Sequence, residues 1–331
     1  MTPAELLIDH CLGPARSQCI YLFTRLGLAE LLFAGPCKCT VLAEAVNVQH
    51  DPLYRMLRAL STMEVVKEQE PGFFALGPLG KPLVANAPNS VKAHVLHMNE
   101  EMYVAWGHAH YSLETGQSAF NFVHGQKYFN WLATHPDKER TAHRAMNDTQ
   151  RLINETVVNA YDFSQVQTVC DVGGGHGALL SALLTHHPQL YGIFFDQKSA
   201  CDLAQSGVGG PLPRCEFVAG DFFIKVPAEA DVYLLKLVLH DWDDESAENI
   251  LAIINRAMNK KAKILVVESL LPDWPATSIA SLWDFHMLVN TGGRERNIKE
   301  LKQIAKKAGL RPVSVKLLDG LFSLVIFESR G

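Results

Sequence analysis

The sequence lacks the features of a secreted, membrane-spanning or metal-stabilised protein. Its seven cysteines are an odd number and none forms a CxxC pair, so a reducing compartment fits better than a disulfide framework. Cys37 and Cys39 have no second Cys or His pair at zinc spacing. No apolar run reaches the length of a membrane span, and acids stand near the amino terminus where a signal peptide carries basic residues. We therefore expect a cytoplasmic protein that binds neither a membrane nor a metal ion.

An excess of positive charge is also missing. The formal net charge is -5, and residues 1–100 contain eight lysines and arginines against nine acids. Without a cationic surface, the phosphate contacts that dominate nucleic-acid affinity are not available. The hydrophobic content of 48% and charged content of 20% are those of a folded globular protein, and 331 residues suggest about two domains.

The pattern over residues 1–100 predicts a winged helix. Apolar residues recur at helical spacing, and Asp51 followed by Pro52 predicts a helix that is capped by the aspartate. Two short strands are expected on either side of Pro71 and Gly72. Winged helices often bind DNA, but the acidic balance favours a packing or dimerisation role. Residues 101–165 are expected to form helices that bridge the two halves.

From residue 166 onward, short apolar strands alternate with amphipathic helices. This alternation predicts a parallel, doubly wound α/β sheet that is covered on both faces. The last two strands, 311–318 and 321–328, are joined by Asp319 and Gly320, a tight-turn signal that requires antiparallel pairing. A doubly wound sheet with an antiparallel edge hairpin is the plan of S-adenosylmethionine-dependent methyltransferases, and not the usual dinucleotide-binding plan.

A glycine-rich loop, DVGGGHG at 171–177, follows the first strand of this half. Gly173 and Gly175 allow the backbone to approach a ligand closely and to turn into the next helix. With Ala178 the same stretch also fits GxGxxA, the fingerprint of nicotinamide and flavin enzymes. The glycines alone therefore leave both cofactor classes open.

Acidic residues at three strand ends narrow this choice. Asp171, ahead of the glycines, suits a cationic amino group and would repel a pyrophosphate; the alternative is that it only holds the turn. Asp196 can accept both ribose hydroxyls in either cofactor class, or cap a helix. Asp221 and Phe222 suit the exocyclic amine and flat face of adenine, or a plain turn.

His240 lies between an apolar run and four acids in LKLVLHDWDDE, residues 235–245. Two interpretations compete: a strand-end histidine that is held by a nearby carboxylate, or a proton acceptor in a cleft. The acids that follow, 241 and 243–245, are interpreted as the N-cap and first turn of a helix in preference to a magnesium site.

The ordered set DVGGGHG, GDFF, LKLVLHDWDDE, VVES and GGRERN resembles the small-molecule O-methyltransferases. That family includes the plant caffeic acid type, acetylserotonin methyltransferase and bacterial phenazine and polyketide enzymes. The resemblance covers essentially the whole chain. It implies a winged-helix dimerisation domain over 1–100, a helical bridge lining the acceptor pocket over 101–165, and an S-adenosylmethionine-binding catalytic domain over 166–331.

The resemblance also implies residue roles. His240 matches the catalytic base, Glu295 an acid that orients it, and Glu268 a second flanking acid. The residues that match or suit cofactor contacts are Asp171, Gly173, Gly175, Asp196, Asp221, Phe222 and Lys236. The residues that match the acceptor pocket are Met146, Trp283, Met287 and Asn290. These matches imply a homodimer that transfers a methyl group, without a metal, to a hydroxyl of a small aromatic acceptor.

Two other functions stay open at this point. An NAD(P)-dependent oxidoreductase would use the GxGxxA spacing and Asp196. A winged-helix regulator with a vestigial cofactor domain would use the amino-terminal half. The sequence does not identify the acceptor, nor does it distinguish methylation of oxygen from methylation of nitrogen.

Overall fold

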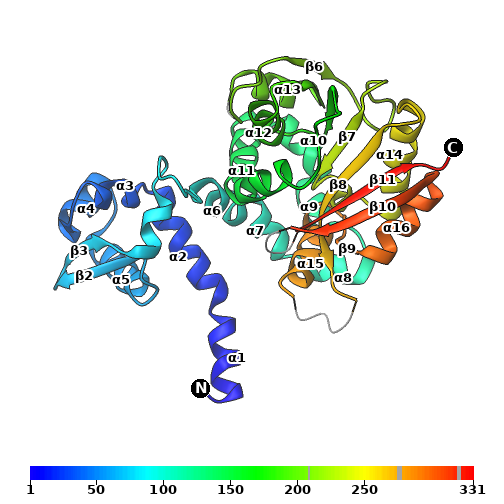
Figure 1. Cartoon of the computed structure of the whole chain (residues 1–331). Helices are drawn as coiled ribbons and strands as arrows, with labels where there is room; N and C mark the ends of the chain where they lie inside the picture. Colours follow the sequence, from blue (N-terminus) through cyan, green and yellow to red (C-terminus); the bar gives the residue numbers. More distant parts are fainter. Residues whose placement is uncertain (208, 274–277, 319–321) are drawn as a thin grey trace. The chain divides into compact units, whose positions relative to one another are not determined.

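The computed structural model describes residues 1–207, 209–273, 278–318 and 322–331, with the side chains of 147 and 149–152 left aside. The chain divides into two units: Met1–Val104 with Arg144–Thr149, and Ala105–His143 with Gln150–Gly331. Figure 1 labels most of the helices and strands of both units. None of the helices in these ranges combines the length and apolar composition that a membrane span requires.

The first unit is mainly helical and carries a small sheet. Its elements are α1 (Pro3–Cys11), α2 (Gly13–Arg25), α3 (Leu28–Phe33), β1 (Cys37–Lys38), α4 (Cys39–Ala45), α5 (His50–Ser61), β2 (Val66–Glu70), β3 (Phe73–Leu76), the 3₁₀ helix η1 (Pro78–Leu83) and α6 (Lys92–Asn99). The strands pair in the order β1-β3-β2. Phe23, Leu28, Leu57 and Phe74 are fully buried in its core. The predicted hairpin around residues 71 and 72 is confirmed.

The predicted cap of α5 is wrong by two residues. The helix begins at His50, Gln49 is its N-cap, and Asp51 lies inside the first turn. Pro52 therefore lies in the first turn, where a backbone N–H would have no hydrogen-bond acceptor within the helix, so the lack of an N–H in proline costs nothing. Asp51 still stabilises the helix start through its charge.

Helices connect the first unit to the sheet of the second. They are α7 (Glu101–Trp106), α8 (Ala109–Thr115), α9 (Ala119–His124), α10 (Tyr128–Ala133) and α11 (Pro136–Val158).

The second unit contains the predicted doubly wound sheet. Its strands are β4 (Thr168–Val172), β5 (Tyr191–Asp196), β6 (Cys215–Ala219), β7 (Val232–Lys236), β8 (Lys263–Leu271), β9 (Arg296–Asn297), β10 (Leu310–Leu317) and β11 (Phe322–Ser329). The main order is β10-β11-β8-β7-β4-β5-β6, and β9 pairs in parallel with the end of β8. Strands β4 to β8 are parallel, whereas β10 and β11 are antiparallel, which confirms the edge hairpin. The predicted turn at Asp319 and Gly320 lies outside the described residues.

Helices pack on both faces of this sheet, as Figure 1 shows. They are α12 (Ala178–His186), α13 (Lys198–Gln205), α14 (Asp244–Ala257) and α16 (Ile298–Lys307). Helix α15 (Ala280–Asn290) instead contacts α8, α9 and β8. Strand β7 shows how the faces form: Tyr233 and Leu235 belong to one buried cluster, and Val232 and Leu234 to another. Successive strand residues point to opposite faces, so an all-apolar strand supplies both cores. The carboxyl ends of β4, β5, β7 and β8 then meet at one edge, where the candidate site lies.

Candidate active site and cofactor site

The glycine loop between β4 and α12 has a backbone that suits glycine. Gly173, Gly175 and Gly177 have φ of 71°, 62° and 82°, in the left-handed region that other residues rarely adopt. A Cβ at Gly173 would lie 2.9 Å from Val238 Cγ2. The loop can therefore turn tightly and present bare backbone at the sheet edge, as cofactor binding requires.

Asp196, at the end of β5, holds this loop. Its Oδ2 accepts a hydrogen bond from the Gly175 N–H at 2.8 Å, and its Oδ1 accepts one from the Gln197 N–H at 2.7 Å. Burial raises the pKa of Asp196 to about 6, against the lowering effect of these two N–H donors. Each carboxylate oxygen has a second lone pair, so the side chain can still accept ribose hydroxyls.

The buried Asp171 and the half-buried Lys236 interact electrostatically on the neighbouring strands β4 and β7. Asp171 is 3% exposed, and burial raises its pKa to about 7 although Lys236 opposes the rise. Burial lowers the pKa of Lys236 to about 8, against the attraction of Asp171. A buried acid with one cation beside it can accommodate a second, such as a ligand's ammonium group. The predicted place of Lys236 beside adenine stays a prediction.

Asp221 and Phe222 follow β6. Asp221 Oδ1 accepts a hydrogen bond from the Phe223 N–H at 2.8 Å, which fixes the turn. The ring of Phe222 meets Trp242 edge to face, with centroids 5.9 Å apart. Asp221 is therefore a turn residue in this structure, and its proposed contact with adenine is an additional role that stays a prediction.

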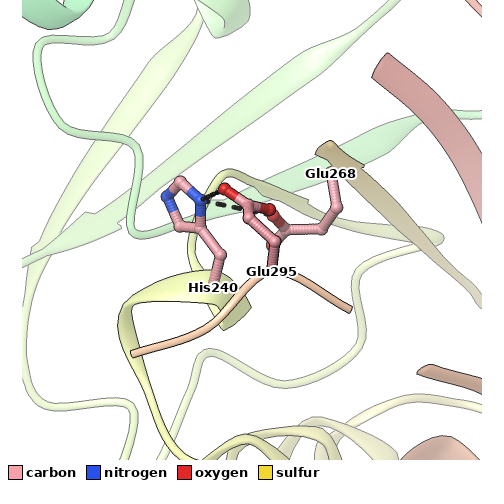
Figure 2. Close-up of side chains that lie close together, drawn as sticks. All are labelled: His240, Glu268 and Glu295. Atoms are coloured by element: carbon pink, nitrogen blue, oxygen red, sulfur yellow. Dashed lines mark hydrogen bonds and ion pairs between the residues drawn. The ribbon is translucent and has the colours of Figure 1, made fainter. Parts of the chain in front are cut away.

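His240 and two glutamates, which are distant in sequence, form a compact group (Figure 2). His240 lies in η2, the 3₁₀ turn Leu239–Asp241 after β7. Its Nδ1 lies 2.9 Å from Glu295 Oε1 and 3.8 Å from Glu268 Oε2. Glu268 comes from β8, and Glu295 directly precedes β9, which pairs with β8. The pairing of β8 with β9 thus brings the carboxylates of Glu268 and Glu295 close to the same ring nitrogen, Nδ1 of His240.

Three carboxylates set the electrostatics of the imidazole. Burial alone lowers the pKa of His240, but Glu295, Glu268 and Asp241 outweigh it and raise the pKa to about 10. Burial raises the pKa of Glu268 to about 7, which His240 partly offsets. The arrangement therefore makes the histidine a much stronger base than a free imidazole.

The acids after His240 divide into two kinds. Asp243 caps α14, accepting the Ser246 N–H at 2.8 Å, and Asp244 and Glu245 lie in the first turn, which confirms their interpretation. Asp241 differs, because its Oδ1 lies 3.9 Å from His240 Nε2. Burial raises its pKa to about 6. It belongs to the His240 group and not to the helix cap.

The donor atoms of His240, Glu268 and Glu295 lie within 4.8 Å of one another, a spacing at which His and carboxylate groups can hold a metal ion. Against this, His240 Nδ1 and Glu295 are already hydrogen-bonded to each other, and Glu268 Oε1 accepts the Leu239 N–H at 2.9 Å. Three donor atoms are therefore engaged within the protein, whereas Oε2 of Glu268 and Oε2 of Glu295 have no hydrogen-bond partner among the described residues.

Helix α15 brings together three of the predicted acceptor-pocket residues. Met287 and Asn290 are buried, at 7% and 1% exposure, and the Trp283 ring meets His286 edge to face with centroids 5.2 Å apart. Asn290 Oδ1 is buried without a hydrogen-bond partner among the described residues. Met146 lies on α11 in the segment grouped with the first unit, so its pocket role stays a prediction.

The sequence interpretation missed two aromatic neighbours of these residues. The Trp106 indole N–H donates a hydrogen bond to His286 Nδ1 at 3.1 Å, and Trp106 also meets Phe285 edge to face at 5.5 Å. It also missed Arg296, whose signal was its place in GGRER beside Glu295. The available clues were a tryptophan in the expected helical bridge and an arginine next to a functional acid.

The fold and the site together define an S-adenosylmethionine-dependent methyltransferase: a parallel sheet with an antiparallel edge hairpin, a glycine loop with strand-end acids, and a carboxylate-bound histidine. A family model described as the O-methyltransferase domain matches residues 106–311, and one described as the O-methyltransferase dimerisation domain matches residues 8–86. The chain belongs to the O-methyltransferase family, acts on small molecules and uses S-adenosylmethionine as its methyl donor.

Individual relatives agree with this assignment. The chain is 37% identical to the phenazine O-methyltransferase PhzM of Lysobacter antibioticus over 99% of this chain and 96% of that protein. It is similar to the mitomycin 7-O-methyltransferase MmcR, with a TM-score of 0.93, 32% identity and coverage of 98% and 97%. It is also similar to NcsB1 from neocarzinostatin biosynthesis, solved with S-adenosylmethionine and 2-hydroxy-5-methyl naphthoic acid, with a TM-score of 0.85, 28% identity and coverage of 95% and 96%. The oxidoreductase and regulator alternatives find no support in these comparisons.

Proposed function

We propose that this enzyme methylates a hydroxyl group of a small aromatic acceptor and that His240 removes the proton of that hydroxyl. The observation that carries the proposal is the 2.9 Å contact between His240 Nδ1 and Glu295 Oε1. A carboxylate on Nδ1 fixes the proton there, so that Nε2 is the nitrogen free to accept a proton. The naphthoic acid in NcsB1 is an aromatic hydroxy acid, which supports the acceptor class.

The raised pKa of His240 matches the chemistry of a phenol. A free imidazole is about 3.5 pKa units less basic than a phenolate, a gap of roughly 5 kcal/mol. With its pKa at about 10, His240 closes this gap, and the proton moves between groups of similar basicity. Glu295 and Glu268 then stabilise the imidazolium that forms.

S-adenosylmethionine, when bound, supplies a methyl carbon activated by its sulfonium. Asp171 would hold the amino group of the cofactor, and Asp196 would hold its ribose. The adenine end would contact Asp221, Phe222 and Lys236. Gly173 and Gly175 would let the backbone approach the cofactor closely. Placing the acceptor oxygen in line with the carbon–sulfur bond is an orientation effect that can lower the barrier by roughly 7 to 11 kcal/mol. We assign the acceptor contacts to Met146, Trp283, Met287 and Asn290.

We further propose that residues 1–100 form the dimerisation domain of a homodimer. Residues 101–165 would form the helical bridge that lines the acceptor pocket, and residues 166–331 the catalytic domain.

We also propose that methyl transfer needs no metal ion, because a sulfonium is electrophilic without a Lewis acid. Dialysis against a chelator should leave turnover unchanged. Loss of turnover that added Mg²⁺ or Zn²⁺ restores would contradict it.

The base assignment is tested with His240→Ala. Turnover should fall by about 10²- to 10⁴-fold, the usual contribution of general base catalysis, while calorimetry gives an unchanged Kd for S-adenosylhomocysteine. Acceptors come from a panel of phenols with labelled cofactor. His186→Ala, at an exposed histidine near the end of α12, is the matched control. Near wild-type turnover in His240→Ala would overturn the assignment.

A further inference from the structure

The turn that carries His240 is too short to hold itself in place. It is a single 3₁₀ turn of three residues, and the preceding Leu237 has a φ of 54°, a left-handed conformation that is unfavourable for leucine. Within the turn, the Trp242 N–H reaches Leu239 O only at 3.3 Å. Bonds from outside the turn must therefore determine where the imidazole lies.

Arg296 supplies two of these outside bonds and a third to the start of α14, while Glu268 Oε1 accepts the Leu239 N–H. Its Nη1 donates to Leu239 O at 2.9 Å, its Nη2 to Trp242 O at 2.8 Å, and its Nε to Asp244 Oδ1 at 2.8 Å. The guanidinium thus bridges the backbone on both sides of His240 and ties it to the start of α14. Only 4% of its side chain is exposed.

The backbone next to Arg296 holds the middle of the same turn. The Arg294 N–H donates to His240 O at 2.8 Å, and a Cβ at Gly293 would lie 2.0 Å from that oxygen. Residues 293–296 therefore contact three successive parts of the turn. The same segment carries Glu295, so the carboxylate that binds the imidazole and the groups that bind the backbone of the turn belong to one short stretch of chain.

We propose that Arg296 is a positioning residue whose guanidinium, by bridging the carbonyl oxygens of Leu239 and Trp242, keeps the His240 imidazole against Glu295 and Glu268. The inference rests on the proposed role of His240 as the base. A planar fork with fixed donor directions is needed to reach two carbonyls and a carboxylate at once, and the single ammonium of lysine cannot replace it.

The test is Arg296→Lys, which keeps the charge and removes the fork. We expect kcat to fall about tenfold to a hundredfold, as for a catalytic group displaced by an ångström, while the Kd for S-adenosylhomocysteine stays unchanged. The ionisable groups around the imidazole are Glu295, Glu268 and Asp241, with Arg296 beside Glu268. Loosening the imidazole from these carboxylates lowers its pKa, which NMR of labelled histidine measures in the substrate-free enzyme.

Arg214→Lys is the matched control. The Arg214 guanidinium also donates to two backbone carbonyls, those of Leu190 at 3.1 Å and Leu184 at 2.5 Å, but it does not contact the turn. It should lower stability without moving kcat or the imidazole pKa. If Arg296→Lys behaves in the same way, with only its melting temperature lowered, Arg296 is merely structural and the proposal is wrong.

Two further results complete the test. If Arg296→Lys does not fold, Asp244→Asn weakens the third anchor of the same guanidinium; it should lower kcat and the imidazole pKa in the same direction, and no change in either overturns the proposal. The NMR readout needs no acceptor. Failure of His240 as the base would appear as turnover retained in His240→Ala, whatever Arg296 does to the imidazole.

Discussion

At the scale of single residues, the catalytic proposal depends on how much negative charge surrounds one imidazole. Glu295, Glu268 and Asp241 all raise the pKa of His240, and two carboxylate oxygens, Oε2 of Glu268 and Oε2 of Glu295, are buried without hydrogen-bond partners among the described residues. Such oxygens are costly unless a positive charge lies nearby. The group is therefore most stable when the imidazole is protonated, as it is after proton transfer.

This charge predicts the pH dependence of the reaction. The pKa of His240 is raised to about 10, so the imidazole is protonated in the free enzyme near neutral pH and cannot accept a proton from a neutral phenol. As pH rises toward 10, the neutral imidazole becomes populated, and kcat/KM should increase. A pH-rate profile from pH 6 to 10 measures this. A flat profile over that range would contradict the raised pKa.

Glu295→Gln provides the matching variant for this profile. Removing that carboxylate lowers the pKa of His240, so the rising limb should move to lower pH and the maximal kcat should fall because the base is weaker. Glu248→Gln, which removes a carboxylate paired with Lys307 and not with His240, should leave the profile unchanged.

Single residues also show what a sequence can and cannot predict. Asp171 and Asp196 were recognisable because each ends an apolar strand, and the ends of parallel strands share one edge. The meeting of His240, Glu268 and Glu295 needed the family resemblance, because no spacing predicts that β9 pairs with β8. Arg296 was missed because its place beside Glu295 does not show that its guanidinium binds the backbone carbonyls of Leu239 and Trp242.

At the scale of elements, the pattern of apolar residues predicts strands and helices well where burial alone determines the secondary structure. Helix α12 and strand β5 follow the alternation that the sequence predicts from residue 166 onward, since each is a short apolar stretch between clear breaks. The start of α5 was misplaced because Asp51 is a stronger capping residue than Gln49, the N-cap that lies two residues earlier. Helix α15 escaped prediction because its buried residues include the polar His286 and Asn290, which interrupt the apolar pattern of a buried helix face.

The start of α16 connects element stability to the active site. Asn297, directly after Arg296, accepts the N–H groups of Lys299 and Glu300 at 2.9 and 3.0 Å, and Glu300 in turn accepts the Asn297 N–H at 2.9 Å. This is a complete capping box. Asn297→Ala should lower the free energy of unfolding by about 1 kcal/mol, measured by urea denaturation.

Asn297→Ser is the control for this cap, because serine keeps an oxygen that can accept the same N–H groups. It should retain most of the stability that Asn297→Ala loses. Equal losses in the two variants would show that the cap does not stabilise α16 and that the asparagine acts through other contacts.

At the scale of the whole molecule, the first unit carries apolar surface that its own core does not bury. Helix α1 has no buried residue, and Leu7 and Ile8 are each 65% exposed. Apolar surface gathered in this way usually marks a protein–protein interface. The match of residues 8–86 to an O-methyltransferase dimerisation domain supports a second copy of the chain as the partner, as in the homodimer proposed above.

This interface predicts the mass of the particle in solution. Light scattering should give about twice the chain mass of 36.7 kDa, and Leu7→Glu with Ile8→Glu should shift the enzyme toward the monomer, because two buried charges without partners oppose association. Strand β10 offers a matched control, since Val315 and Leu317 are 44% and 75% exposed on the second unit. Val315→Glu with Leu317→Glu should leave the dimer intact. A dimer that survives the α1 substitutions and dissociates with the β10 substitutions would place the interface on the catalytic sheet.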